Sequence, residues 1–562
     1  MNERMLITVP VGIEDFKELK EKSYFVDKSR FIKELLDYSG TKVSLFTRPR
    51  RFGKTLMLSM LLYFFSIDNA DENRKLFAGL EIENEDPRYM ARQGSAPVLF
   101  LTLKNIYGKD YTEFLSTFSQ AIARFYRNYE CILEGAALSS VDRETFRKIL
   151  NGTQNESVLQ YALLDLSYFL NKYYKRKPII LIDEYDAPIV SSWEHQYYTR
   201  CINFMRNFYG TCLKTNNNFD FAVLSGVTRI SKESIFSGLN NFEVYSILSN
   251  EFDDIFGFTD DELTKTMQFF DVSDNYKDVK EWYDGYIFGR TEIYNPLSVM
   301  KYLKSKCVPQ AYWTNTSSNS IIKELLKDLP DSIYHDLADL LNDNTVDKYI
   351  DESLLFDEMK ENRNSIFSLL AATGYLKVIK KDYIENKWLC KLKIPNKEIY
   401  SIYKTELCRN LSPDSEQKLD LLLASMISGN ENEFSRILQD FLIDIVSFFD
   451  TTKKLQESFY HGLILGLIAS LRKEYYIKSN GESGYGRFDI ACIPKRHTSP
   501  GILLEFKSSK SKKVLSSDAD NALKQIESNK YDTIFHEYKT QKLWKYGIAF
   551  YKKNVVVKMS AQ

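Results

Sequence analysis

The sequence predicts a multidomain α/β protein with a parallel sheet covered by helices, a mostly helical middle, and a smaller mixed α/β domain at the end. Three observations lead to this fold class. Short apolar runs alternate with helical patterns up to residue 255, amphipathic helical runs dominate 256–450, and the order of elements changes again from 451. The 562 residues are enough for about three or four domains. We therefore expect domains at 1–255, 256–450 and 451–562.

Apolar runs predict the strands of the first domain, at Val43–Phe46, Val98–Leu103, Ile179–Ile182 and Phe221–Leu224. Strands that alternate with long helical patterns favour a parallel sheet covered by helices. The longest apolar stretch, Leu56–Ile67, falls short of the about 20 residues that a membrane span requires. We expect it to form a buried core helix directly after the first strand and its loop.

The middle and the end of the chain differ in pattern. Within the helical middle, a helix at Ser368–Ala372 precedes strand-like runs at Leu376–Ile379 and Trp388–Ile394, which predicts a small winged helix. The last domain should have the order αβββαββ, with helices at 455–473 and 516–528 and strands at 475–478, 487–493, 501–506, 546–550 and 553–558.

Composition excludes several classes of protein. Lys and Arg total 75 against 76 Asp and Glu, so the chain does not bind nucleic acid by uniform positive charge, and any such binding must be local. No two of the seven cysteines lie close enough for a zinc knuckle or a redox pair. We expect reduced thiols in a cytoplasmic protein. The polar N-terminus lacks a secretory signal, and we expect no membrane partner.

A phosphate-binding loop is predicted between the first strand and the apolar helix. A helix N-terminus with a close backbone approach, a lysine and a hydroxyl provides the groups that bind phosphates and Mg²⁺. Gly53 allows the approach, Lys54 would reach the β- and γ-phosphates, and Thr55 would ligate Mg²⁺. Arg48 stands where the usual G-x4-G-K-[ST] spacing has its first glycine. Arg50 and Arg51 either face phosphate or are surface charge.

Two acids end the third predicted strand. In nucleoside triphosphatases the first acid of such a pair holds Mg²⁺ and the second polarises the attacking water, so we assign these roles to Asp183 and Glu184. The fourth strand leads to Ser225, Thr228 and Arg229. Either hydroxyl could sense the γ-phosphate, and Arg229 could stabilise its charge. The alternative is an ordinary exit from strand to loop.

A second chemical site is predicted on the strands of the last domain. Glu505 and Lys507 are two residues apart and project from the same face, which Asp489 on the neighbouring strand can reach. Two carboxylates form an oxygen-rich Mg²⁺ site, and a lysine beside them can stabilise phosphorane charge. This is the construction of a metal-dependent phosphodiesterase. The alternative for Glu505 and Lys507 alone is an ion pair.

Further residues could complete this second site. Glu457, on the preceding helix, could join the metal shell, although His461 one turn later could be the functional residue instead. Gln525, on the following helix, could position the water or the lysine. The basic run from Lys507 to Lys513 either contacts phosphates or is a solvated loop.

The motifs taken together resemble a known bacterial family, the AAA-ATPase-like proteins of Bacteroides- and Clostridium-type bacteria. The resemblance rests on the segments 24–29, 48–55, 181–186, 282–286 and 294–296, and in that family an arginine-rich loop replaces the first glycine. The last domain resembles the PD-(D/E)XK nuclease superfamily, which carries its metal on an Asp and a Glu-x-Lys, here Asp489, Glu505 and Lys507. The resemblance implies a P-loop ATPase core and a restriction-endonuclease-like α/β domain. It assigns no role to Asp27, Lys28 or Trp282–Tyr286, for which we expect turn chemistry and helix starts.

These sites predict an ATP-binding, ATP-hydrolysing protein coupled to a Mg²⁺-dependent nuclease, with ATP and Mg²⁺ as cofactors and DNA favoured over RNA. Defence against foreign DNA is one biological setting for such a pair of activities. The alternatives are an ATP-switch signalling protein whose nuclease-like domain binds nucleic acid without cutting, and a partner-binding protein with a vestigial nucleotide site. A homo-oligomer is also expected, because AAA-type ATPases often assemble into rings, so that Arg229 could act on a neighbouring subunit.

Overall fold

The computed structural model describes the chain from Thr8 to Gln562, with gaps. It leaves out 39, 231–241, 314–330, 342, 353–364, 386, 404–414, 449–456, 469–470, 472–473, 480, 497, 537 and 539. By packing, the chain forms two compact units. The first combines 1–313 with 348–396, and the second combines 314–347 with 397–562. The three predicted domain ranges stay a prediction. The packing divides the chain differently, because it places 397–450 in the second unit and 348–396, which contain the predicted wing, in the first.

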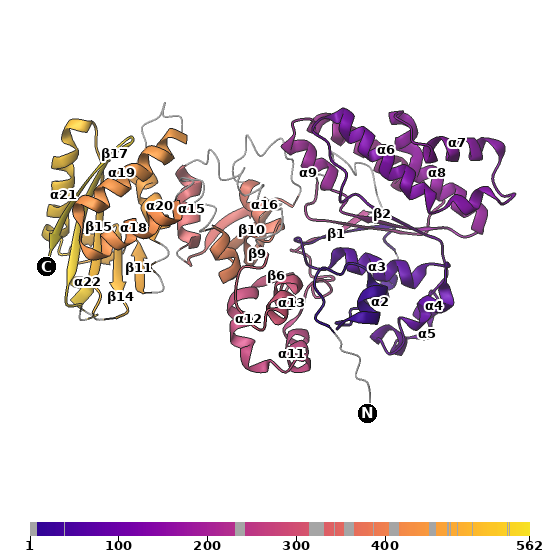
Figure 1. The fold of residues 1–562 in the computed structure, drawn as a ribbon, viewed down its shortest axis with the longest axis horizontal. Coiled ribbons are helices and arrows are strands. Elements are labelled where there is room, and N and C mark those ends of the chain that lie inside the picture. The colour runs from indigo at the N-terminus through magenta and orange to yellow at the C-terminus, as the bar shows by residue number, and fades with distance from the viewer. Residues whose placement is uncertain are drawn as a thin grey trace. The chain divides into compact units, whose positions relative to one another are not determined.

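A five-stranded parallel sheet is the centre of the first unit and confirms the predicted fold class (Figure 1). Its strand order is β2-β3-β4-β1-β5, with bounds β1 Val43–Thr47, β2 Val98–Thr102, β3 Ile179–Asp183, β4 Ala222–Gly226 and β5 Phe242–Tyr245. The fifth strand was not predicted, since its four residues include an exposed glutamate. Because β4 lies between β1 and β3, the loops after these three strands meet at one edge.

Helices cover both faces of this sheet (Figure 1). On the face with α3 (Lys54–Phe65) lie α1, α2, α4 and α5, with bounds Phe16–Lys22, Arg30–Asp37, Ala70–Lys75 and Pro87–Met90. The opposite side carries α6 (Tyr111–Arg127), α7 (Ser140–Leu150), α8 (Glu156–Tyr174), α9 (Ala187–Glu194) and α10 (Tyr198–Leu213). As expected, α3 is a buried core helix, with Met60, Leu61 and Phe64 fully covered. Aspartates or a capping box start α1, α6 and α7.

The segment that follows β5 belongs to the first unit as well. Its elements are α11 (Asp260–Phe269), α12 (Tyr276–Tyr283), the hairpin β6 (Tyr286–Phe288) and β7 (Thr291–Ile293), and α13 (Pro296–Lys304). Lys28 ties the N-terminal segment to α11, because its buried ammonium donates to Glu262 Oε2 and to Asp254 O, each at 2.6 Å. Asp27 accepts the N–H groups of Ser29 and Glu81, which is the turn role expected for it.

A helix and three strands occupy the place of the predicted winged helix. After α16 (Ser365–Ala372), β9 (Lys377–Ile384) and β10 (Lys387–Lys393) form an antiparallel hairpin, and β8 (Val346–Ile350) adds a third strand. Both predicted strand-like runs lie within or against this hairpin. The helical middle is thereby confirmed, and the winged helix stays a prediction.

The second unit is built on a mixed sheet with the strand order β11-β14-β15-β16-β17. The bounds are β11 Tyr475–Ser479, β14 Ile490–Pro494, β15 Gly501–Ser508, β16 Leu543–Tyr551 and β17 Asn554–Ala561, and a small hairpin, β12 (Glu482–Ser483) with β13 (Gly486–Arg487), precedes β14. Only the pair β15 and β16 is parallel. The helix α21 (Leu515–Ser528) makes that crossover, and α22 (Thr533–His536) follows it.

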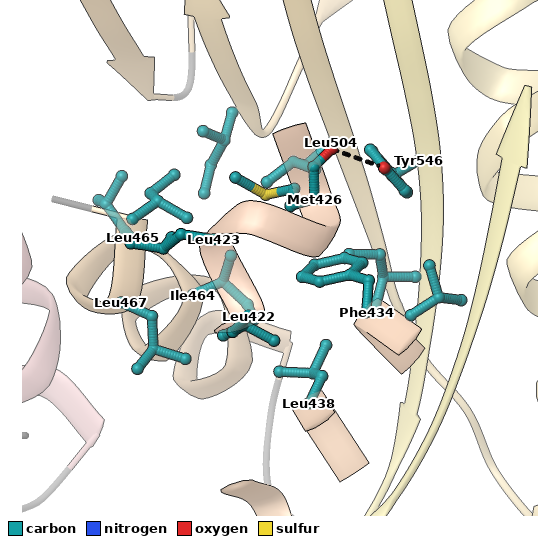
Figure 2. Packing of buried hydrophobic residues seen from close by; sticks show 14 of the residues in the cluster. Leu422, Leu423, Met426, Phe434, Leu438, Ile464, Leu465, Leu467, Leu504 and Tyr546 are labelled. Carbon is teal, nitrogen blue, oxygen red and sulfur yellow. Dashed lines mark hydrogen bonds between the residues drawn. The ribbon is translucent and has the colours of Figure 1, made fainter. Parts of the chain in front are cut away.

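Each face of this sheet has its own core. On one face α18 (Ser415–Ser428), α19 (Glu431–Phe448) and α20 (Glu457–Ile468) bury Phe506. Figure 2 shows Leu504 and Tyr546 in the same core. The Tyr546 hydroxyl donates to Met426 O at 2.8 Å, the bond drawn in Figure 2. On the other face Leu503 packs with residues of α21 and α22. The helix α15 (Asp331–Leu341) contacts α20.

No helix in the described part of the chain is long and apolar enough to cross a bilayer. The six cysteines that the structure describes are free thiols, and Cys408 lies outside the described residues.

Candidate functional site

The phosphate loop connects β1 to α3, as predicted. Gly53 stands just before the helix with φ of 84°, in the left-handed region where a side chain would be strained. The Lys54 ammonium is buried and donates to Arg48 O at 2.9 Å and to Pro49 O at 2.8 Å. Burial lowers the pKa of Lys54 to about 8, against the opposing charges of Glu184 and Asp183. Lys54 thus stabilises the conformation of its own loop through these two hydrogen bonds.

Asp183 joins three elements at the edge of the sheet. The Thr55 hydroxyl donates to Asp183 Oδ2 at 2.8 Å, and the Ser225 hydroxyl donates to Asp183 Oδ1 at 2.6 Å. The carboxylate is fully buried at the end of β3. A hydroxyl and a carboxylate in contact at the start of a helix are oxygen ligands of the kind that Mg²⁺ prefers. The structure therefore brings together Thr55 and Asp183, the two residues predicted to share the metal.

Glu184 follows directly and has an unusual backbone conformation, with φ of 51°. Its side chain is half-buried. Burial raises the pKa of Glu184, and the negative charge of Asp183 adds to the rise, while Lys54 opposes it. A carboxylate with a raised pKa beside a phosphate loop has the properties of a proton acceptor for water.

Asp186 is a site residue that the sequence interpretation missed. Its Oδ2 accepts the N–H of Val227 at 3.0 Å and the N–H and hydroxyl of Thr228, each at 2.8 Å. Tyr185 helps on the buried side, where its hydroxyl donates to Thr228 O at 2.7 Å and accepts from Ile230 N. The sequence signal that could have identified it is a second aspartate three residues after Asp183. The strand-end acids therefore hold the loop after β4 in place.

This arrangement changes the interpretation of the loop residues. The Thr228 hydroxyl is engaged with Asp186, and Ser225 is the hydroxyl that contacts Asp183. Arg229 is half-buried at the end of the same loop. The nucleotide roles of Thr228 and Arg229 stay predictions.

The arginines of the phosphate loop divide into two kinds. Arg48 is fully buried, and its guanidinium donates to Thr47 O, Tyr245 O and Phe252 O at 2.8–2.9 Å. Burial lowers its pKa to about 9. Arg48 therefore stabilises the loop through these bonds to backbone carbonyls. Its role at the position of the usual first glycine is structural. Arg51 is exposed with φ of 72° and lies 3.9 Å from Glu14, and Arg50 is half-buried. Their contact with phosphate stays a prediction.

The phosphate loop also packs against the segment around Trp282–Tyr286. The Phe52 ring lies 4.9 Å from the ring of Tyr286 and 5.2 Å from that of Phe288, both in the hairpin β6–β7 or at its start. Tyr286, from a motif to which no role was assigned, is thus part of the wall of the loop.

The second candidate site lies on β15 and its neighbours. Leu503 and Leu504 pack on opposite faces of the sheet, so Glu505 and Lys507 share the face of Leu503 and α21. Glu505 is buried, its Oε1 lies 3.9 Å from the Lys507 ammonium, and Gln525 Nε2 donates to the same oxygen. The structure thus brings Gln525 to the Glu-x-Lys pair.

Asp489 completes the cluster. Its Oδ2 accepts the N–H of Phe506 at 2.7 Å, and its own N–H donates to Glu505 Oε2 at 3.4 Å. These two neighbouring carboxylates beside a partly exposed lysine are oxygen ligands with net negative charge, the kind that Mg²⁺ prefers. Four of the five predicted residues of this site therefore lie together.

Glu457 and His461 both lie on α20. Glu457 is its first residue, and its side chain lies outside the described part, so its metal role stays a prediction. His461 is buried, with Nε2 3.2 Å from Asp489 O and 3.3 Å from Ser479 Oγ. It supports the backbone of Asp489 from the other face. Among the described residues, no group of three or more His, Cys, Asp or Glu is placed to hold a metal.

Two family models match this chain, each over a range that contains one candidate site. Residues 10–236 match the family described as "Predicted AAA-ATPase", and residues 455–560 match the PD-(D/E)XK nuclease superfamily. Both resemblances are confirmed. The first match contains the phosphate loop, and the second contains the carboxylate cluster. A protein of Azotobacter chroococcum mcd 1, described as an uncharacterized protein in the vnfD 5′ region, is 24% identical over 538 residues, which cover 93% of this chain and 92% of that protein.

Proposed function

We propose that this chain binds and hydrolyses ATP at its phosphate loop and cleaves phosphodiester bonds of nucleic acid at its C-terminal sheet, both with Mg²⁺. The contact that supports the first half most strongly is Thr55 with Asp183, which are 128 residues apart in sequence and 2.8 Å apart in space. The convergence of Asp489, Glu505, Lys507 and Gln525 supports the second half.

The chain's own residues would divide the ATPase work as follows. Lys54 would exchange its two loop carbonyls for β- and γ-phosphate oxygens. Thr55 and Asp183 would hold Mg²⁺, which supplies charge neutralisation on the phosphate oxygens. Glu184, with its raised pKa, would orient the attacking water and take its proton.

At the nuclease-like site, Asp489 and Glu505 would hold the metal. Lys507 would stabilise the charge that develops on the attacked phosphate, and Gln525 would keep Glu505 in position. We further propose DNA rather than RNA as the substrate, a cytoplasmic location, a homo-oligomer and a role in defence against foreign DNA. The substrate, the oligomer and the defence role rest on the resemblance, and the location rests on the spacing of the cysteines.

A second candidate function is an ATP-controlled protein that binds nucleic acid without cutting it. The observation in its favour is that three carboxylate oxygens of the cluster, Glu505 Oε1 and Oε2 and Asp489 Oδ2, already accept hydrogen bonds from the protein. Cleavage separates the two functions directly.

Two lysine variants, each with a matched control, test the proposal. Lys507→Ala should reduce Mg²⁺-dependent cleavage of DNA at least 100-fold, because the lysine stabilises charge in the transition state. ATP binding should be unchanged, because Lys507 is not part of the phosphate loop. Lys148→Ala, exposed on α7 of the other unit, is the control. Lys54→Ala should weaken ATP binding at least tenfold, while Lys148→Ala on the surface of α7 should not. Cleavage that persists in Lys507→Ala, or unchanged ATP affinity in Lys54→Ala, would refute the corresponding half.

A further inference from the structure

The face of the C-terminal sheet that carries Glu505 also carries exposed aromatic and basic side chains on β11. Tyr475 and Ile477 pack into the core beneath α18–α20. Because side chains alternate along a strand, Tyr476 and Lys478 project to the opposite face, the one that holds Leu503 and hence Glu505. The two groups therefore lie on the same face of the sheet, with the buried Leu503 and the helices α21 and α22 between them.

Four residues form what we name the tyrosine platform: Tyr476, Tyr538, Lys478 and Lys495. Tyr476 is 53% exposed, and its ring centroid lies 6.4 Å from that of the half-buried Tyr538. The Lys495 ammonium lies 5.0 Å from the Tyr476 ring centroid, and the Lys478 ammonium lies 5.5 Å from that of Tyr538. Each ring thus has a cation within the range of a cation–π contact.

The platform begins close to the candidate nuclease centre. The strand order is β11-β14-β15, and Lys478 pairs with Ala491, which pairs with Leu503. With neighbouring strands about 4.8 Å apart, Lys478 is displaced about 10 Å from β15, at the level of Leu503 and two residues before Glu505. Tyr476 lies about 7 Å farther along its strand. Because α22 covers Leu503 between the two, a nucleic-acid strand whose phosphate lies at Glu505 would cross α22 to reach the platform.

The chemistry of the platform favours unpaired bases. A scattered exposed tyrosine needs no explanation, but here two neighbouring rings each have an ammonium group on one face beside a carboxylate cluster. Stacking on an aromatic ring requires a free base face, and lysines beside the rings neutralise the flanking phosphates. In a duplex the faces of the bases are already stacked on one another. The lysines would attract either form, but stacking on the rings favours a single strand.

We propose that the tyrosine platform binds an unpaired segment of the nucleic-acid strand next to the scissile phosphate, so that the substrate class is single-stranded or locally melted nucleic acid. The position of the platform relative to the reaction rests on the proposed function. Binding at the platform does not, because Tyr476 and its neighbours take no part in the chemistry.

The test is binding of a fluorescent single-stranded oligonucleotide and of the matching duplex to the full chain carrying Lys507→Ala, without Mg²⁺. Adding Tyr476→Ala should weaken single-strand binding roughly tenfold, since stacking contributes about 1–3 kcal/mol per base, or roughly 5- to 150-fold. Tyr476→Phe should retain binding because it keeps the ring. Tyr161→Ala, a half-exposed tyrosine on α8, is the control and should have no effect. Duplex binding should change less than twofold with Tyr476→Ala.

Equal weakening for single strand and duplex, or single-strand binding by the Tyr476→Ala variant that matches the Tyr161→Ala control, would overturn the proposal. So would a chain that does not bind the single strand at all. The outcomes separate from those of the proposed function. A chain that fails to cut but loses single-strand binding with Tyr476→Ala refutes the nuclease activity and supports the platform. A chain that cuts, yet is indifferent to Tyr476→Ala in binding, refutes the platform alone.

Discussion

Asp186 allows a direct test of how the strand-end acids position the loop after β4. Replacing it with alanine removes the acceptor of Val227 N–H and of the N–H and hydroxyl of Thr228. Hydrogen bonds to a charged acceptor contribute about 1.5–3 kcal/mol each, and a buried donor left without a partner costs about 1–3 kcal/mol. Water can reach the half-buried Val227 but not Thr228, which is 2% exposed. We expect a local loss of about 3–5 kcal/mol.

Amide hydrogen exchange measures this loss without any assumption about activity. A loss of about 3 kcal/mol corresponds to roughly 150-fold faster exchange, so the amides of 227 and 228 in Asp186→Ala should exchange roughly 100-fold faster or more. Asp186→Asn keeps a neutral acceptor, and its amides should exchange only roughly tenfold faster. The control is Asp382→Ala, an exposed acid paired with Lys380 at 2.8 Å. Exchange in Asp186→Ala within threefold of the unaltered chain would refute the argument.

Other residues of the first unit give further predictions. Burial raises the pKa of Glu34 to about 7 against the opposing charge of Arg30. The unfolded carboxyl releases its proton near pH 4.5 and the folded one near 7, so its contribution to the free energy of unfolding falls as pH rises between these values. Glu34→Gln should remove this fall, about 1–2 kcal/mol after solvent screening, in urea titrations at pH 5 and 7.5. Gly285→Ala should cost about 2–5 kcal/mol, because φ is 96° and a Cβ would lie 2.3 Å from Pro395 O. Gly210→Ala, inside α10 with no atom within 4 Å of an added Cβ, should instead stabilise by about 0.5–1 kcal/mol, and a lower urea midpoint would contradict this.

Local sequence patterns were sufficient for the elements and for the ends of strands. The alternation of apolar runs and helical spacing predicted β1 to β4, α3 and most of the last domain, because each of these signals lies within one short window. For the same reason Gly53, Lys54, Asp183 and Glu505 could be selected as candidate residues. Gln525 was found through its place on the helix after the Glu-x-Lys strand.

Contacts between distant parts of the chain could not be predicted in this way. The role of Arg48 depends on the carbonyls of Tyr245 and Phe252, about two hundred residues later in sequence. A charged side chain in a basic loop gives no local sign of full burial. Asp186 and Thr228 are likewise joined only by the order of the strands, which places β4 beside β3. Strand order in a parallel sheet depends on crossover connections, and no single segment records it.

The internal bonds of Lys54 have a consequence for ligand discrimination. The Lys54 ammonium donates to two backbone carbonyls of its own loop, at 2.9 and 2.8 Å. Any ligand of the ammonium therefore competes with these two carbonyls. An anion gains from Lys54 only the difference between its own attraction and what these carbonyls already provide. A group with several phosphate oxygens and full negative charge exceeds them, whereas a single weakly charged oxygen gains little. If the loop binds nucleotide as proposed, it would favour a polyphosphate before any contact with a base or sugar is made.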